Sequence, residues 1–122
     1  MQQKIHPSLI PKNQRELLVG AKKLQGLVKN IHLDVVDGKF APNSSLQFPF
    51  RLPREFTYSA HLMIKKPEAW IKKYGGRVAL SIPHAEELRD VSRYVQQTRK
   101  QKRKVAVALL PETPVTLLKP AL

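Results

Sequence analysis

Hydrophobic and polar positions follow two different periods along this chain. After residue 13, apolar residues recur three or four positions apart, which is the spacing of one helix face; they are Leu17, Ala21, Leu24 and Val28. Asn13 and Glu16 precede this stripe at the spacing of a capping box. The pattern predicts a helix within residues 13–30.

Short segments rich in β-forming residues alternate with helical patterns through the rest of the chain. The predicted strands are 4–10, 28–38, 56–64, 77–82 and 104–110, and the further helices are 66–76, 84–100 and one capped by Thr113 with Pro114 as its first residue. Residues 39–55 contain three prolines and predict a loop. Strands alternating with helices predict a single α/β domain over 1–122, with about five parallel strands and flanking helices.

Composition narrows the functional classes without selecting one. The 122 residues include no cysteine, which excludes disulfides and thiolate zinc sites. The N-terminus lacks a signal-peptide pattern, and no window approaches the roughly 18 apolar residues of a membrane span. We therefore expect a soluble, cytoplasmic protein without a membrane partner.

Candidate chemistry lies in two of the predicted strands. Side chains two positions apart on a strand share a face, so His32 and Asp34 project together, and His61 projects from the next strand along the chain. Two imidazoles and a carboxylate suit a divalent ion such as Zn²⁺, Fe²⁺ or Mn²⁺. A strand histidine is more often a hydrogen-bonded core residue, so spacing alone leaves both interpretations open.

The segment IHLDVVDGKFAPN, residues 31–43, resembles the second-strand signature of the ribulose-phosphate 3-epimerase family, His-Leu-Asp-Val-Met-Asp-Gly followed by Phe-x-Pro-Asn. Three further segments resemble the family in the same order along the chain: HPSLI, SAHLMIKKPEAWI and VAVALLPETPVTLL. The resemblance covers essentially the whole chain. It implies the first five or so units of a TIM (β/α)₈ barrel, a fold of typically about 250 residues, and therefore an incomplete barrel.

The resemblance also implies roles for individual residues. His32, Asp34 and His61 match three of the family's four metal ligands, Asp34 matches one of its two acid/base groups, and His61 matches a substrate-binding position. The implied reaction interconverts ribulose 5-phosphate and xylulose 5-phosphate by proton transfer at C3, an isomerisation of the pentose phosphate pathway. The remaining ligand and opposing carboxylate belong to a seventh strand in the family, so we expect this short chain to be catalytically deficient.

Some residues depart from the family pattern. Pro11 replaces a serine, Val36 replaces a methionine, and Leu110 and Glu112 alter an Asn-Pro-Gly-Thr-Pro turn. The segment SIPHAEE resembles the family's Phe-His-Val-Glu-Ala only if His84 and Glu86 are shifted by one residue, and it predicts no catalytic role for either.

An alternative function follows from charge. The formal net charge is +13, and the run RKQKRK occupies residues 99–104, so a basic module that binds nucleic acid or another polyanion is the rival hypothesis. The run is not accompanied by a recognised nucleic-acid-binding motif, and it is also typical of a solvated helix end. We therefore expect no specific nucleic-acid partner. Unpaired edges of a partial sheet predict possible homo-oligomers.

Overall fold

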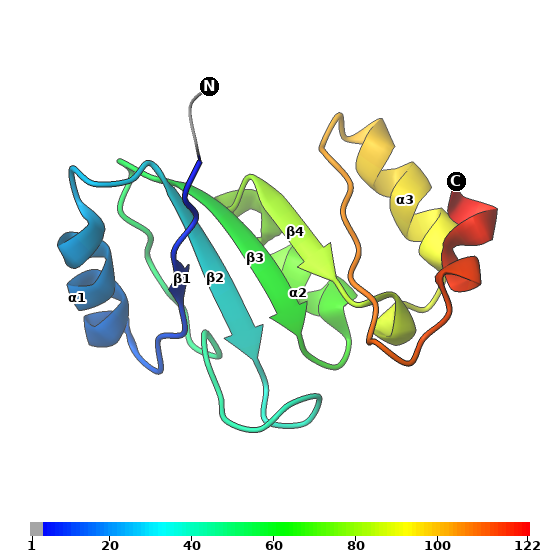
Figure 1. Ribbon diagram of the computed structural model, residues 1–122, viewed down its shortest axis with the longest axis horizontal. Coiled ribbons are helices and arrows are strands. Elements are labelled where there is room, and N and C mark those ends of the chain that lie inside the picture. Colours follow the sequence, from blue (N-terminus) through cyan, green and yellow to red (C-terminus); the bar gives the residue numbers. More distant parts are fainter. Residues whose placement is uncertain (1–3) are drawn as a thin grey trace.

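The computed structural model describes residues 4–122 and contains one parallel sheet with helices beside and behind it (Figure 1). The strands are β1 (Ser8–Leu9), β2 (Asn30–Val36), β3 (Thr57–Met63) and β4 (Leu80–Pro83). The α-helices are α1 (Gln14–Leu24), α2 (Pro67–Tyr74) and α3 (Val91–Lys100). Three 3₁₀ helices complete the described elements: η1 (Gly75–Arg77), η2 (Ala85–Glu87) and η3 (Val115–Ala121).

The four strands lie side by side in the order of the sequence, β1-β2-β3-β4, and every pair is parallel. In the longest pairing, His32 lies opposite Ser59 and Asp34 lies opposite His61. This arrangement confirms the predicted α/β class. Helices follow three of the strands, as expected for crossovers between parallel strands.

The hydrophobic core fills the helix-covered face of the sheet. Side chains alternate between buried and partly exposed along β2 and β3, because successive residues of a strand face opposite sides. The completely buried positions include Leu33 and Leu62, which pack in one cluster with Leu17 of α1 and Trp70 of α2. Figure 1 shows α2 behind β3 and β4, and α1 beside β1. The opposite face of β2 and β3 is left for polar side chains.

The proline-rich loop between β2 and β3 contributes an aromatic anchor to this core. Phe50 is fully buried, and its ring centroid lies 4.9 Å from that of Tyr74 and 6.0 Å from that of Trp70. The Arg77 guanidinium lies over the Phe50 ring and donates to the Phe50 carbonyl. The loop is therefore packed against α2 although, as predicted, it forms no helix.

Two of the helix starts follow the predicted chemistry. The Asn13 side chain accepts a hydrogen bond of 2.9 Å from the backbone N–H of Glu16, so Asn13 is the N-cap of α1. Glu16 Oε1 in turn accepts from the N–H of Lys12, one residue before the position that a standard capping box uses. Pro67 occupies the first turn of α2, where its missing N–H leaves no hydrogen bond unmade.

The prediction of a continuous helix over 84–100 was wrong in its first part. Residues 85–87 form the 3₁₀ helix η2, and α3 begins only after Asp90, whose side chain caps the N–H of Arg93. Asp90 is a strong N-cap residue that starts a new helix, and Leu88 packs as a buried residue outside that helix. The interruption places His84 and Glu86 in the connection after β4.

The prediction of a fifth strand over 104–110 was also wrong. Within the described chain this segment makes a single parallel bridge, between Ala108 and His84. Among residues 4–122, its backbone joins the sheet region through the hydrogen bonds of Ala108, 2.8 Å each to Pro83 and Ala85. The segment is only partly buried, so its apolar run lacks the cover on both faces that a central parallel strand has.

The last predicted helix differs in type and in its first residue. Pro114 is the N-cap, and residues 115–121 form the 3₁₀ helix η3 with Pro120 inside it. Proline has no backbone N–H and clashes with the preceding turn of an α-helix. The predicted α-helix starting at Pro114 is therefore replaced by a more tightly wound 3₁₀ helix that contacts α3.

Asp37 ties together two loops at the carboxyl ends of β2 and β3. Its Oδ1 accepts from the N–H groups of Lys39 and Phe40, at 2.8 and 2.9 Å, and its Oδ2 accepts from the N–H of Lys65 at 2.7 Å. Burial acts to raise the pKa of Asp37, but these backbone hydrogen bonds outweigh it and hold the pKa below its ordinary value. Asp37 therefore has a structural role: its hydrogen bonds connect the loops that follow β2 and β3.

The Asp37→Asn substitution is expected to lower the free energy of unfolding by about 1.5–3 kcal/mol. An amide cannot accept on both of its ends, so at least one of these backbone N–H groups loses its acceptor. Because the pKa of Asp37 is lower in the folded state, its ionised carboxylate stabilises the fold at pH values above the unfolded-state pKa of about 3.9. This stabilisation is lost as the pH falls through the pKa of the folded state. Urea unfolding from pH 7 to pH 2 should thus show the gap between wild type and Asp37→Asn narrowing in acid.

The exposed Glu55→Gln substitution is the control for this measurement, because it removes a carboxylate that lies in solvent. It should leave the free energy of unfolding nearly unchanged. Equal stability of Asp37→Asn and Glu55→Gln at neutral pH would contradict the role assigned to Asp37.

No helix in the described part of the chain has both the length and the apolar character needed to cross a membrane.

Candidate metal centre

Three side chains from neighbouring strands meet on the polar face of the sheet. His32 and Asp34 project from β2, and His61 projects from β3 directly opposite Asp34. Successive residues of a strand point to opposite faces of the sheet. His32, Asp34 and His61 therefore lie on one face, whereas the adjacent Leu33 and Ala60 are fully buried on the other. The structure therefore brings together the three predicted ligand-type side chains.

The distances among these groups fit a shared cation better than direct hydrogen bonding. Asp34 Oδ1 lies 3.3 Å from His32 Nε2 and 3.7 Å from His61 Nδ1, and one donor atom from each residue falls within 4.8 Å of the others. Both pairs are ion-pair contacts without hydrogen-bond geometry, unlike the His84 Nδ1–Glu86 Oε1 pair, which is hydrogen-bonded at 3.3 Å. Ligands about 2.0–2.1 Å from a tetrahedral ion are separated by roughly 3.3–3.4 Å. The donor set suits Zn²⁺ or another divalent transition metal.

Two serines contact His32 and Asp34, the candidate ligands of β2, from outside the cluster. Ser59 Oγ lies 2.9 Å from His32 Nδ1. When this hydroxyl accepts a hydrogen bond from Nδ1–H, the lone pair of His32 Nε2 points toward Asp34. The buried Ser45 hydroxyl donates 2.6 Å to the backbone carbonyl of Asp34. Such contacts commonly fix the ring and backbone orientation of metal-binding residues.

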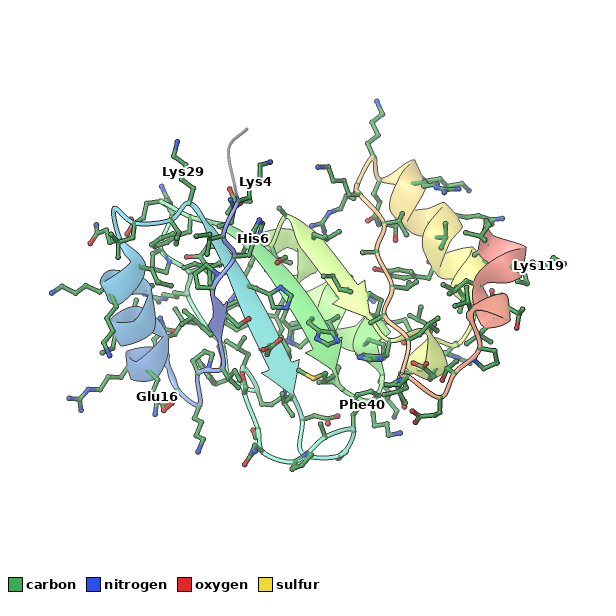
Figure 2. All side chains as sticks on the ribbon, viewed as in Figure 1. Lys4, His6, Glu16, Lys29, Phe40 and Lys119 are labelled. Carbon is green, nitrogen blue, oxygen red and sulfur yellow. The ribbon has the colours of Figure 1, made fainter. Side chains whose placement is uncertain are left out.

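A third histidine joins the cluster from the connection after β4. His84 is only 5% exposed, and its Nε2 lies 2.8 Å from His61 Nε2. On its other side, His84 Nδ1 lies 3.3 Å from Glu86 Oε1. The ring of Phe40 packs against His84 with centroids 4.7 Å apart, and Figure 2 shows Phe40 beyond the carboxyl ends of β2 and β3.

The surroundings favour the neutral form of one imidazole of the cluster and the charged form of the neighbouring Glu86 carboxylate. Burial lowers the pKa of His61, as do the neighbouring His84 and His32, while Asp34 acts in the opposite direction. Burial acts to raise the pKa of Glu86, but hydrogen bonds, chiefly from the Thr113 hydroxyl and the Leu110 N–H, hold it below its ordinary value. A neutral imidazole is the form that binds a metal ion.

The sequence patterns did not predict the position of His84 and Glu86 beside the cluster. Strand periodicity could not find them, because both lie beyond the end of β4. The available signal was the segment SIPHAEE, in which a histidine and a glutamate two positions apart directly follow a predicted strand. Parallel strands end at a common edge, so this pair had to lie near the ends of β2 and β3.

The basic run at residues 99–104 ends α3 and enters the following turn, away from this cluster (Figure 1). Arg103 of the run is partly buried and donates to the backbone carbonyl of Val78, whereas Arg99, Lys100, Lys102 and Lys104 are exposed. A structural role thus accounts for one cation of the run. Polyanion binding by the others stays a prediction.

Comparisons with known proteins match the chain to one family. The model of the ribulose-phosphate 3 epimerase family matches residues 4–122. The ribulose-phosphate 3-epimerase of Bacillus subtilis is 34% identical over 94 residues, which cover 72% of this chain and 43% of that protein. That of Treponema pallidum is 32% identical over the same length and coverage. That of Mycobacterium bovis is 27% identical over 116 residues, covering 91% of this chain and 50% of the relative.

The chain thus spans about half the length of the curated relatives it matches. A four-stranded parallel sheet with flanking helices is consistent with an incomplete (β/α)₈ barrel. The family match covers nearly all of the chain and includes every strand described above. On this evidence the chain belongs to the ribulose-phosphate 3-epimerase family.

Proposed function

We propose that these residues form the metal-holding part of a site that interconverts ribulose 5-phosphate and xylulose 5-phosphate. The observation that carries the proposal is the convergence of His32, Asp34 and His61 at distances suited to one divalent cation. The relatives are ribulose-phosphate 3-epimerases, and the proposal extends their activity to this site. A phosphorylated ketopentose is the corresponding substrate.

Asp34 is the proposed acid/base group. Its carboxylate takes the proton from C3 of the sugar phosphate, and the electron pair of the broken C–H bond moves toward C2 to form an enediolate. Returning a proton to C3 restores the ketose. Asp34 is partly exposed and opposite His61, so it can both contact a substrate and share a cation with the imidazoles.

The cation, when bound, would stabilise the negative charge that develops on the enediolate oxygens, an effect typically worth several kcal/mol. His32 and His61 would hold it beside Asp34, and His61 would also contact the substrate. Inversion at C3 needs a second proton donor on the opposite face of the sugar. With Asp34 as the acid/base group of these 122 residues, we expect proton exchange at C3 to be faster than epimerisation.

The test begins with calorimetric titration of the chain with Zn²⁺ and Co²⁺. Wild type should bind one ion, and His32→Ala and His61→Ala should each lose most of the affinity. The matched control is His6→Ala, which removes an exposed histidine that Figure 2 shows at the opposite end of the sheet. If affinity survives both site substitutions, the proposed ligand set is wrong.

The second arm follows ribulose 5-phosphate in D₂O by proton NMR with the metal-loaded chain. Deuterium should enter at C3 faster than xylulose 5-phosphate appears. Absence of exchange in a metal-bound chain would contradict the role of Asp34. Binding of oligonucleotides that weakens with salt, without metal binding, would instead favour the polyanion-binding alternative.

A further inference from the structure

The contact between His61 and His84 requires one ring nitrogen to donate and the other to accept. The two Nε2 atoms are 2.8 Å apart, the ring centroids are 4.9 Å apart, and the ring planes are inclined by 27°. A neutral imidazole carries its proton on one nitrogen and a lone pair on the other. The direction of this hydrogen bond therefore decides which nitrogen of His61 is free on the side of Asp34.

Glu86 sets that direction from the far side of His84. An ionised carboxylate can only accept, so His84 Nδ1, 3.3 Å from Glu86 Oε1, has to carry a proton in order to donate to it. His84 Nε2 is then a lone pair that accepts from His61 Nε2–H. His61 Nδ1, which lies 3.7 Å from Asp34 Oδ1, is left with its lone pair directed into the cluster.

We infer that Glu86 and His84 are positioning residues that fix His61 as its Nε2–H tautomer and so prepare Nδ1 to bind the cation beside Asp34. The inference rests on the proposed function for its ligand, but the tautomer itself is a property of the metal-free chain. The effect of Glu86 and His84 passes through His61.

The surroundings of the two residues are built to hold this arrangement. Glu86 Oε2 accepts the backbone N–H of Leu110 at 2.8 Å, which orients the carboxylate. His84 is buried between the Phe40 ring and the His61 ring. The backbone bridge between His84 and Ala108 fixes the chain on which the imidazole stands. Outer partners of this kind typically change metal affinity by about 10- to 100-fold when they are altered.

The Glu86→Gln substitution tests the direction of the hydrogen bonds with almost no change in shape. The Leu110 N–H needs an acceptor, so the glutamine carbonyl should take the Oε2 position and turn the amide NH₂ toward His84 Nδ1. His84 Nδ1 then accepts, and His84 Nε2–H donates to His61. The His61 proton should move to Nδ1, which removes the lone pair from the cation position.

The first measurement is ¹⁵N NMR of the imidazoles in the metal-free protein at about pH 8, where ordinary histidines are neutral. We expect His61 to carry its proton on Nε2 in wild type and on Nδ1 in Glu86→Gln. The matched control is Glu87→Gln, which removes the neighbouring carboxylate that pairs with Lys65 rather than with His84. It should keep the wild-type tautomer.

The second measurement is titration with Co²⁺ and Zn²⁺. Glu86→Gln should bind each ion about 10- to 100-fold more weakly than wild type, with Glu87→Gln close to wild type. A wild-type His61 protonated on Nδ1, or a Glu86→Gln chain that keeps both the wild-type tautomer and the wild-type affinity, would overturn the inference. If neither wild type nor any variant binds metal but the tautomers change as expected, Glu86 and His84 do set the His61 tautomer, and the proposed metal site is wrong.

Discussion

Replacing Asp34 with asparagine is expected to lower the affinity for Zn²⁺ or Co²⁺ by more than about 100-fold. Changes to outer partners of a metal site already cost about 10- to 100-fold, and Asp34 is the proposed ligand that lies nearest to both imidazoles. Asparagine keeps the size of the side chain but removes its charge. Isothermal titration of wild type and Asp34→Asn gives the comparison directly.

The same substitution should abolish deuterium exchange at C3 of ribulose 5-phosphate, because an amide cannot serve as the base. Asp90→Asn is the matched control. Asp90 caps α3 through the N–H of Arg93, and asparagine is an equally good N-cap residue. Full metal affinity in Asp34→Asn would contradict its place among the ligands. Full exchange activity would contradict its place as the acid/base group.

Replacing Phe50 with alanine is expected to lower the free energy of unfolding by about 3–5 kcal/mol. The side chain is completely buried between the loop and α2, against Trp70 and Tyr74. Truncation leaves a cavity and removes the ring on which Arg77 stacks. Since the free energy of unfolding of a small domain is only about 5–15 kcal/mol, this single substitution should remove a large part of it.

Urea unfolding followed by circular dichroism and by the fluorescence of Trp70, the single tryptophan of the sequence, measures this loss. Phe48→Ala is the matched control, since Phe48 is only partly buried and lies two residues from Phe50 in the same loop. Its loss of stability should be clearly smaller. Equal losses for the two substitutions would show that the loop does not anchor the core through Phe50.

The proposed metal centre and the aromatic anchor lie on opposite faces of one sheet. Along β2 and β3, alternate residues supply either the cation cluster or the core. Core packing therefore fixes the strand register that places His61 opposite Asp34, because a shift of one residue would turn every side chain to the other face. Stability and site geometry share the same backbone.

Local sequence determined the main strands, the first helix and the shared face of the three candidate site residues. Alternation along residues 30–36 and 57–63 put His32, Asp34 and His61 on one face, and the structure confirms that arrangement. The Asn13 cap and Pro67 fixed the starts of α1 and α2. These features depend on neighbouring residues in the chain, so periodicity and capping rules are sufficient to find them.

Only the tertiary structure decided the conformation of residues 84–90 and 104–110 and the hydrogen-bond partners of His61. The run at 104–110 has strand-like composition, but pairing depends on what lies beside it, and in the described chain it makes one bridge. His84 reaches His61 across 23 positions of sequence, and Glu86 reaches the Leu110 N–H across 24. Such contacts arise from the packing of distant segments, which no local pattern contains.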